Sequence, residues 1–125
     1  MAQRRVRRGV LNEYLLNGKC EGYIYVGFLD KKDDIYKIGR SVDPFKRLIG
    51  LKREHGNNFK FYTFSKKLWN YAVAEQTLHN SLCEPICNNK YKGDEWFYLG
   101  NMDIERLLSD MERLEIASDE MYEFE

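Results

Sequence analysis

The sequence predicts an α/β (α+β) fold, with a small central, mainly antiparallel β-sheet flanked by helices. Runs in which apolar and polar side chains alternate every two residues are interspersed with longer segments of helical periodicity, in the order β-β-α-β-α-β-α. The chain has 125 residues, of which 43% are hydrophobic and 32% charged. This length and this composition are typical of one soluble domain with a hydrophobic core of its own.

The first two predicted strands form a β-hairpin. Residues 22–28 and 35–40 are rich in Ile, Val, Tyr and Phe, and they flank a polar break at 29–34, which is typical of a hairpin with a longer loop. Alternation places one apolar set on each strand: Ile24, Val26 and Phe28 on the first, Tyr36 and Ile38 on the second. If these sets share a face, Tyr25 and Lys37 project together from the other face, either as a proton-transfer pair or as two solvated residues.

A helix and a third strand are expected after the hairpin. Asp43 is a suitable N-cap and Pro44 a suitable first helical residue, and Gly56 lies just beyond the expected end of the helix. The residues with the spacing of a buried helix face are Phe45, Leu48 and Ile49. Residues 59–64 alternate as the third strand.

The next helix contains the most informative acid of the chain. Ser65 can cap this helix, which is expected to run to about Leu82, and Glu75 falls inside its apolar stripe. A carboxylate on the inward face of a helix needs a cationic partner or a metal ion, because an isolated buried charge is very costly. Glu75 is therefore predicted to be either an ion-paired structural residue or a metal ligand.

The rest of the chain contributes one short strand and two flanking segments. An irregular connection at 83–94 leads into a strand at 95–99. Residues 101–125 are expected to form a C-terminal helix with a frayed acidic tail, packed on the same domain. Residues 1–20 are expected to form a mobile basic arm followed by a short helix. The main domain is therefore predicted to comprise residues 21–100.

Charge is distributed unevenly, although the formal net charge is zero. Between Lys37 and Lys67 there are nine Lys or Arg and two acids, whereas from Asn101 onward there are nine acids and two Arg. A basic middle permits an anionic partner. Three cysteines at no disulfide spacing, no apolar run long enough for a bilayer and no secretory signal predict an intracellular protein, in the cytoplasm or nucleus of a host cell, without a membrane partner.

The order of the motifs resembles the GIY-YIG nuclease superfamily. Residues 23–25 (Tyr-Ile-Tyr) take the place of its Gly-Ile-Tyr motif, and residues 37–39 (Lys-Ile-Gly) that of its Tyr-Ile-Gly motif. The closer likeness is to a phage- and virus-associated branch that is usually described as a DNA-binding domain. The motifs of that branch correspond to Tyr36 to Arg40, Asp43 to Leu48, Glu75 to His79 and Glu95 to Phe97. Lys37 departs from the superfamily's tyrosine, although some restriction-enzyme-like members use lysine there.

This resemblance implies a metal-dependent DNA endonuclease that hydrolyses phosphodiester bonds. Tyr25 would accept a proton from the attacking water, with Lys37 as the cation that favours the phenolate. Arg47 would clamp the phosphate, and Glu75 would hold a single Mg²⁺ or Mn²⁺, with no small-molecule cofactor. The side chains expected to contact DNA are Arg40, Lys46, Lys52, Arg53 and Lys60, and the supporting residues are Tyr23, His55, His79, Asn88 and Asn89.

Two other functions stay open at this point. The chain could be a DNA-binding module with the same fold that cleaves weakly or not at all, or an interaction protein whose acidic tail docks a basic partner. A zinc site made of His79, Cys83, Cys87 and Cys20 matches no common zinc spacing, and Pro85 interrupts the helix that would align it. Free thiols and a hydrogen-bonded histidine are therefore expected.

Overall fold

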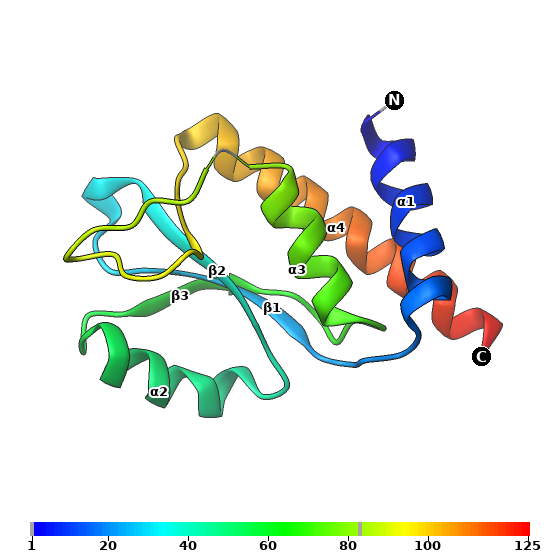
Figure 1. The fold of residues 1–125 in the computed structure, drawn as a ribbon, viewed down its shortest axis with the longest axis horizontal. Coiled ribbons are helices and arrows are strands. Elements are labelled where there is room, and N and C mark those ends of the chain that lie inside the picture. Colours follow the sequence, from blue (N-terminus) through cyan, green and yellow to red (C-terminus); the bar gives the residue numbers. More distant parts are fainter. Residues whose placement is uncertain (1, 83) are drawn as a thin grey trace.

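A four-stranded antiparallel sheet and four α-helices make up the computed structural model, which describes residues 2–82 and 84–125 (Figure 1). The elements are, in chain order, α1 (Ala2–Asn17), β1 (Tyr23–Phe28), the 3-10 turn η1 (Lys31–Asp33), β2 (Ile35–Ser41), α2 (Pro44–His55), β3 (Lys60–Phe64), α3 (Tyr71–Asn80), β4 (Trp96–Tyr98) and α4 (Asn101–Phe124). The predicted α+β class is confirmed, and strands three and four agree with their predicted ranges to within one residue at each end.

The sheet has the strand order β3-β1-β2-β4, so that the predicted hairpin forms its centre. Val26 lies opposite Ile38 in this hairpin, and both are buried in the same core. The two apolar sets therefore share a face, as predicted. Tyr25 lies opposite Gly39, and Gly27 lies opposite Lys37. Tyr25 and Lys37 are thus diagonal neighbours on the other face of the hairpin.

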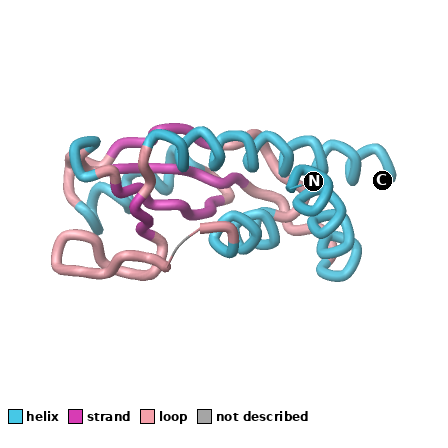
Figure 2. Tube along the Cα trace, turned by 90° about the horizontal axis from the view of Figure 1, so that it is seen from above, coloured by secondary structure: helices cyan, strands magenta, loops and turns pink. Residues whose placement is uncertain are grey.

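Helices cover the two faces of the sheet unequally. Helices α1, α3 and α4 lie on one side and α2 on the other, with the strands as a layer between them (Figures 1 and 2). The larger core, between the sheet and the three helices, includes Val26, Ile38, Leu78 and Leu107. The smaller core lies on the α2 side and consists of Tyr25, Leu51, Phe59, Tyr91 and Trp96. Tyr25 is therefore a core residue as well as a candidate site residue.

Helix α3 begins later than the sequence indicates. The Asn70 side chain accepts hydrogen bonds from the backbone N–H groups of Ala72 and Val73, so Asn70, not Ser65, is the N-cap. Ser65 is buried instead, and its hydroxyl accepts from the Ile24 N–H at 3.0 Å. Both residues are good caps. The structure uses one as the cap and the other to close the edge of the hairpin.

The exposed face of α2 is also different from the predicted one. Asp43 caps the helix and Pro44 opens it, as expected. Leu51 is fully buried against the sheet and Leu48 is half-buried against the same core, as predicted for Leu48, whereas Phe45 is 72% and Ile49 62% exposed. The spacing of apolar residues shows which of them share a helix face. It does not show which face packs on the sheet, because that depends on the position of the helix in the fold.

Both chain ends are more helical than expected. The first helix extends back to Ala2, through the segment predicted to be a basic arm. Helix α4 continues to Phe124, because Ala117, Ser118 and Met121 are buried in its last turns. The Ser118 hydroxyl accepts from the Trp69 N–H at 2.7 Å and ties this part of the tail to the domain. No helix in the described part of the chain is both long and apolar enough to cross a membrane.

A first prediction concerns Gly39. A Cβ at this position would overlap the ring and hydroxyl of Tyr25. Tyr25 is buried and lies over the backbone of β2, so its ring has little room to move. Gly39→Ala is therefore expected to lower the free energy of unfolding by roughly 1–3 kcal/mol, the usual range for overpacking. Denaturant unfolding followed by circular dichroism measures this change.

Gly9→Ala is the matched control. Gly9 lies in α1, and an added Cβ there meets no atom within 4 Å. Alanine is favoured over glycine in a helix by about 1 kcal/mol, so this variant should be as stable as the parent or more so. If the Gly39→Ala variant and the parent had equal free energies of unfolding, the ring of Tyr25 could move away from an added Cβ at no cost.

Candidate functional site

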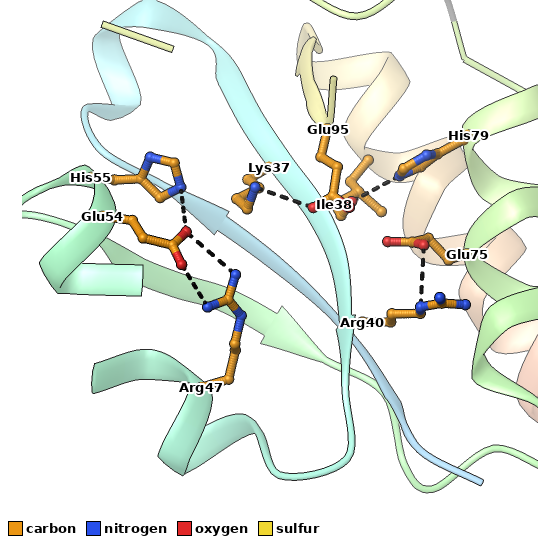
Figure 3. Close-up of polar contacts among 9 residues, drawn as sticks. All are labelled: Lys37, Ile38, Arg40, Arg47, Glu54, His55, Glu75, His79 and Glu95. Atoms are coloured by element: carbon orange, nitrogen blue, oxygen red, sulfur yellow. Dashed lines mark hydrogen bonds and ion pairs between the residues drawn. The ribbon is translucent and has the colours of Figure 1, made fainter. Parts of the chain in front are cut away.

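The predicted site residues lie on both sides of β2, in two groups of polar side chains (Figure 3). The pairing of β4 with β2 covers only Ile35–Lys37, so the part of β2 beyond Lys37 lies past the end of β4. Helix α3 lies along this part of the strand, where His79 Nε2 is 2.8 Å from the Ile38 carbonyl oxygen. His79 therefore positions α3, and with it Glu75, beside β2.

Tyr25 connects the two groups. Its side chain is 1% exposed, packs on Phe61 with ring centroids 5.4 Å apart, and crosses the backbone of Gly39. Burial raises the pKa of the phenol well above its usual value, and the charge of Glu95 raises it further. A hydrogen bond and the charge of Arg47 oppose this rise. The free protein therefore holds Tyr25 protonated at neutral pH, and Arg47 is the cation that favours its ionisation.

Lys37 has a different partner from the one expected. Its side chain is 7% exposed, and Nζ lies 3.1 Å from Glu95 Oε1 and 5.6 Å from the centroid of the Trp96 ring. The pairing of Lys37 with Trp96 across β2 and β4 places Glu95 at the start of β4, next to this ammonium group. Lys37 shares a face with Tyr25 as predicted, but its charge is directed at Glu95.

Arg47 is held by a carboxylate two helical turns further along α2. Its guanidinium forms two bonds with Glu54, Nη1–Oε1 at 2.9 Å and Nη2–Oε2 at 3.4 Å. This bidentate pair lowers the pKa of Glu54 and raises that of Arg47. His55 Nε2 lies 3.6 Å from Glu54 Oε2. Burial lowers the pKa of His55, so this imidazole is held neutral.

Glu75 has the cationic neighbour that one of its two predicted roles requires. Its side chain is 14% exposed, and Oε1 lies 3.7 Å from Arg40 Nε. The second oxygen, Oε2, is buried and has no hydrogen-bond partner. Burial, followed by the charge of Glu95 and a hydrogen bond to it, raises the pKa of Glu75 to about 7, while Arg40 acts in the opposite direction. Arg40 is therefore an ion-pair partner at a distance too long for a hydrogen bond, and Glu95 is the second neighbour of this carboxyl group.

The donor groups at this point fit a hard divalent cation. Glu75 offers an unpartnered buried oxygen, Glu95 is a second carboxylate close enough to shift its pKa, and Mg²⁺ takes one or two protein carboxylates and keeps several waters. Among the described residues no group of three or more His, Cys, Asp or Glu could enclose a metal ion. His79 bonds to a backbone carbonyl, and Cys20 and Cys87 are exposed free thiols. Cys83 lies outside the described residues.

The remaining predicted residues spread over the surface around the site. Arg40 packs its guanidinium on the Tyr71 ring, 5.0 Å from the centroid, and Lys52 donates to the Asn57 carbonyl at 3.2 Å. Asn88 supports a turn by accepting from the N–H groups of Lys90 and Tyr91. The others are Lys46, Arg53 and Lys60, which are exposed, Tyr23, which is half-buried, and Asn89, which borders an open depression beside Glu54 and His55. Their roles in binding DNA or supporting the site stay predictions.

Two acids of the site are missing from the residues selected by sequence. Glu95 belongs to the Glu-Trp-Phe motif but shows no periodicity of its own, because it lies just before a strand of three residues. Glu54 follows Arg47 by seven residues, which is two helical turns. The seven-residue spacing from Arg47 could have indicated that Glu54 lies beside it. The position of Glu95 in the Glu-Trp-Phe motif could have indicated that it belongs to the site.

A protein-family model described as the T5orf172 domain matches residues 22–114, which is more than half of the chain. The match includes all four strands, α2 and α3, and reaches into α4. It also covers the four motifs on which the resemblance was based. Neither a curated protein nor a solved structure matches the chain.

A second prediction concerns the protonation of Glu75. Its pKa is raised on folding, to about 7, so the folded state binds a proton that the unfolded state releases between about pH 4.5 and 7. This carboxyl therefore lowers stability as pH rises through that window. Glu75→Gln removes this titrating group. As pH rises from 5 to 8, the free energy of unfolding of the variant should therefore increase relative to that of the parent by on the order of 1–2 kcal/mol, after allowance for partial solvent access.

Denaturant unfolding of both proteins at several pH values measures this difference. The difference between the two proteins is the informative quantity, because the lowered pKa of His55 gives stability the opposite pH dependence. A difference that does not change with pH would mean that Glu75 is ionised throughout.

Proposed function

The chain belongs to the T5orf172 domain family, and we propose that it is a metal-dependent DNA endonuclease of the GIY-YIG type. The observation that carries the proposal is Glu75, an inward-facing carboxylate with one buried oxygen unpartnered. Its charge and that of Glu95 both raise the pKa of Tyr25, and Arg47 lowers it. This proximity supports a site in which Glu75 would bind a metal ion, Arg47 a phosphate, and Tyr25 the attacking water.

Each side chain has a role that its position supports. Arg47 would bind two oxygens of the scissile phosphate with its planar fork. Tyr25 would hold the attacking water and take its proton, next to that clamp. Glu75, with Glu95 beside it, would hold Mg²⁺ or Mn²⁺; when bound, the ion would polarise a phosphate oxygen and add positive charge near the phenol. Lys37 would neutralise Glu95, so that two carboxylates can lie close together.

Two observations favour a second function, a DNA-binding module that does not cleave. The pKa of Tyr25 is raised in the free protein, which makes the phenol a poor base. Arg47 is also occupied by Glu54. Cleavage therefore requires that DNA and metal together displace Glu54 and lower the pKa of Tyr25. Binding alone requires only the positive side chains on α2 and β3.

A third prediction separates these two functions. The protein should nick or cut supercoiled DNA with Mg²⁺ or Mn²⁺ and not with a chelator. Glu75→Ala and Arg47→Ala should each reduce the rate by at least about a hundredfold, because each removes charge stabilisation at the phosphate. Gel electrophoresis of the DNA over time measures the rates.

Arg106→Ala is the control for loss of one positive charge. Arg106 is exposed on α4, away from β2. This variant should cleave like the parent. Metal-independent binding by all the proteins, without cleavage by any of them, would establish the binding module and reject the endonuclease.

A fourth prediction follows from the Arg47–Glu54 pair. Glu54→Gln removes the bidentate ion pair and frees the guanidinium, so affinity for DNA should rise by roughly fivefold, equivalent to about 1 kcal/mol. Fluorescence anisotropy with labelled duplex DNA in chelator measures this without cleavage. Glu112→Gln, at an exposed position on α4, makes the same charge change away from Arg47 and sets the baseline. Weaker binding by Glu54→Gln would instead show that Glu54 orients Arg47 for phosphate.

A further inference from the structure

A group of apolar side chains on the outer surface of α2 has no cover in the structure. Phe45 is 72% exposed and Ile49 is 62% exposed, one helical turn apart. Phe64, at the end of β3, is 40% exposed and meets Phe45 edge to face, with ring centroids 5.8 Å apart. We refer to Phe45, Ile49 and Phe64 as the α2 platform. A contiguous exposed apolar patch of this kind marks a binding surface more often than a solvated one.

The α2 platform is continuous with the proposed active site. Phe64 lies directly opposite Tyr25 in the pairing of β1 with β3. Phe61 contacts both rings, at centroid distances of 5.4 Å to Tyr25 and 6.0 Å to Phe64. A chain of aromatic contacts thus leads from the candidate catalytic phenol to the exposed ring of Phe45. A ligand seated on the platform would therefore lie next to the residues that pack on Tyr25.

Positive charge adjoins the α2 platform. Lys46 and Arg53 are exposed on α2, whereas Lys60 lies opposite Phe28, on the other face of the sheet. Within the described residues, neither Lys46 nor Arg53 forms an ion pair of its own. Flat apolar rings flanked by free cations are the combination with which proteins bind single-stranded nucleic acid, because bases stack on the rings while the cations follow the backbone.

Charge also decides against a second copy of the chain as the occupant. A two-fold interface brings the same patch of both copies together. The positive side chains of Lys46 and Arg53 would then lie in one interface with those of the other copy, and such like-charge contacts oppose association. A polyanion with exposed flat faces meets both features of the platform at once.

We propose that Phe45 and Phe64 stack unpaired nucleobases, so that the preferred substrate is DNA with unpaired nucleotides next to the phosphodiester to be cut. This rests on the proposed function, since it assumes that DNA reaches Arg47. In an intact duplex the bases stack on one another and cannot lie on an outward-facing ring. Unpaired bases can do so at little cost.

The test compares three labelled DNAs in chelator, by fluorescence anisotropy with the full chain. The first is a fully paired duplex, the second carries a short unpaired loop in one strand, and the third has the same loop with abasic nucleotides. The second and third have equal backbone charge and differ only in the bases. The looped DNA should bind about tenfold more tightly than the abasic one. Phe45→Ala should abolish that preference, and Phe45→Trp should keep it.

Phe124→Ala is the matched control, because it removes an equally exposed phenylalanine (81%) at the far end of α4. It should leave all three affinities unchanged. Equal binding of looped and abasic DNA by the parent would overturn the stacking proposal while the proposed function stood. The same holds if the parent is a dimer in size-exclusion chromatography and Phe45→Ala is a monomer. Failure of the parent to bind any of the three DNAs would instead reject the proposed function itself.

Discussion

The absence of a side chain at Gly39 is the constraint on which the site depends. Gly39 lies opposite Tyr25 in the central hairpin, and the phenol occupies the space that a Cβ would take. The ring of Tyr25 therefore crosses over β2 on the α2 face of the sheet, with its hydroxyl above Gly39. At this crossing the charges of Arg47 from α2 and of Glu75 from α3, two helices on opposite faces of the sheet, both act on the pKa of the phenol.

The charges around this crossing are already paired with one another. Lys37 forms an ion pair with Glu95, and Arg47 forms one with Glu54. Arg40 lies near only one oxygen of Glu75. The Arg47–Glu54 pair is partly exposed, so exchanging Glu54 for another anion costs little. A phosphate can replace Glu54 at Arg47, and a divalent cation can add its charge beside Glu75. The arrangement favours partners that supply both a negative group and a cation, which a metal-bound phosphodiester does.

Backbone periodicity explains what the sequence could predict. The two-residue period of a strand is enough to place Tyr25 with Lys37, and the helical period is enough to place Glu75 inward. The cation that each acid meets depends on how separate elements pack, which is why Glu54 and Glu95 were missed. The predicted start of α3 was wrong for a related reason. Ser65 and Asn70 are equally good caps locally, and the contact of Ser65 with Ile24 decides between them.

The wrong prediction for α2 is the most informative one. Phe45, Leu48 and Ile49 have the spacing of a buried face, yet the helix turns Leu51 to the sheet and leaves Phe45 and Ile49 outside. A sequence selected only for stability would place polar residues there, since exposed phenylalanine gains nothing from folding. Places where local pattern and tertiary structure disagree are expected at functional surfaces. Phe61 contacts both Tyr25 and Phe64, so the mismatch on α2 lies next to the proposed active site.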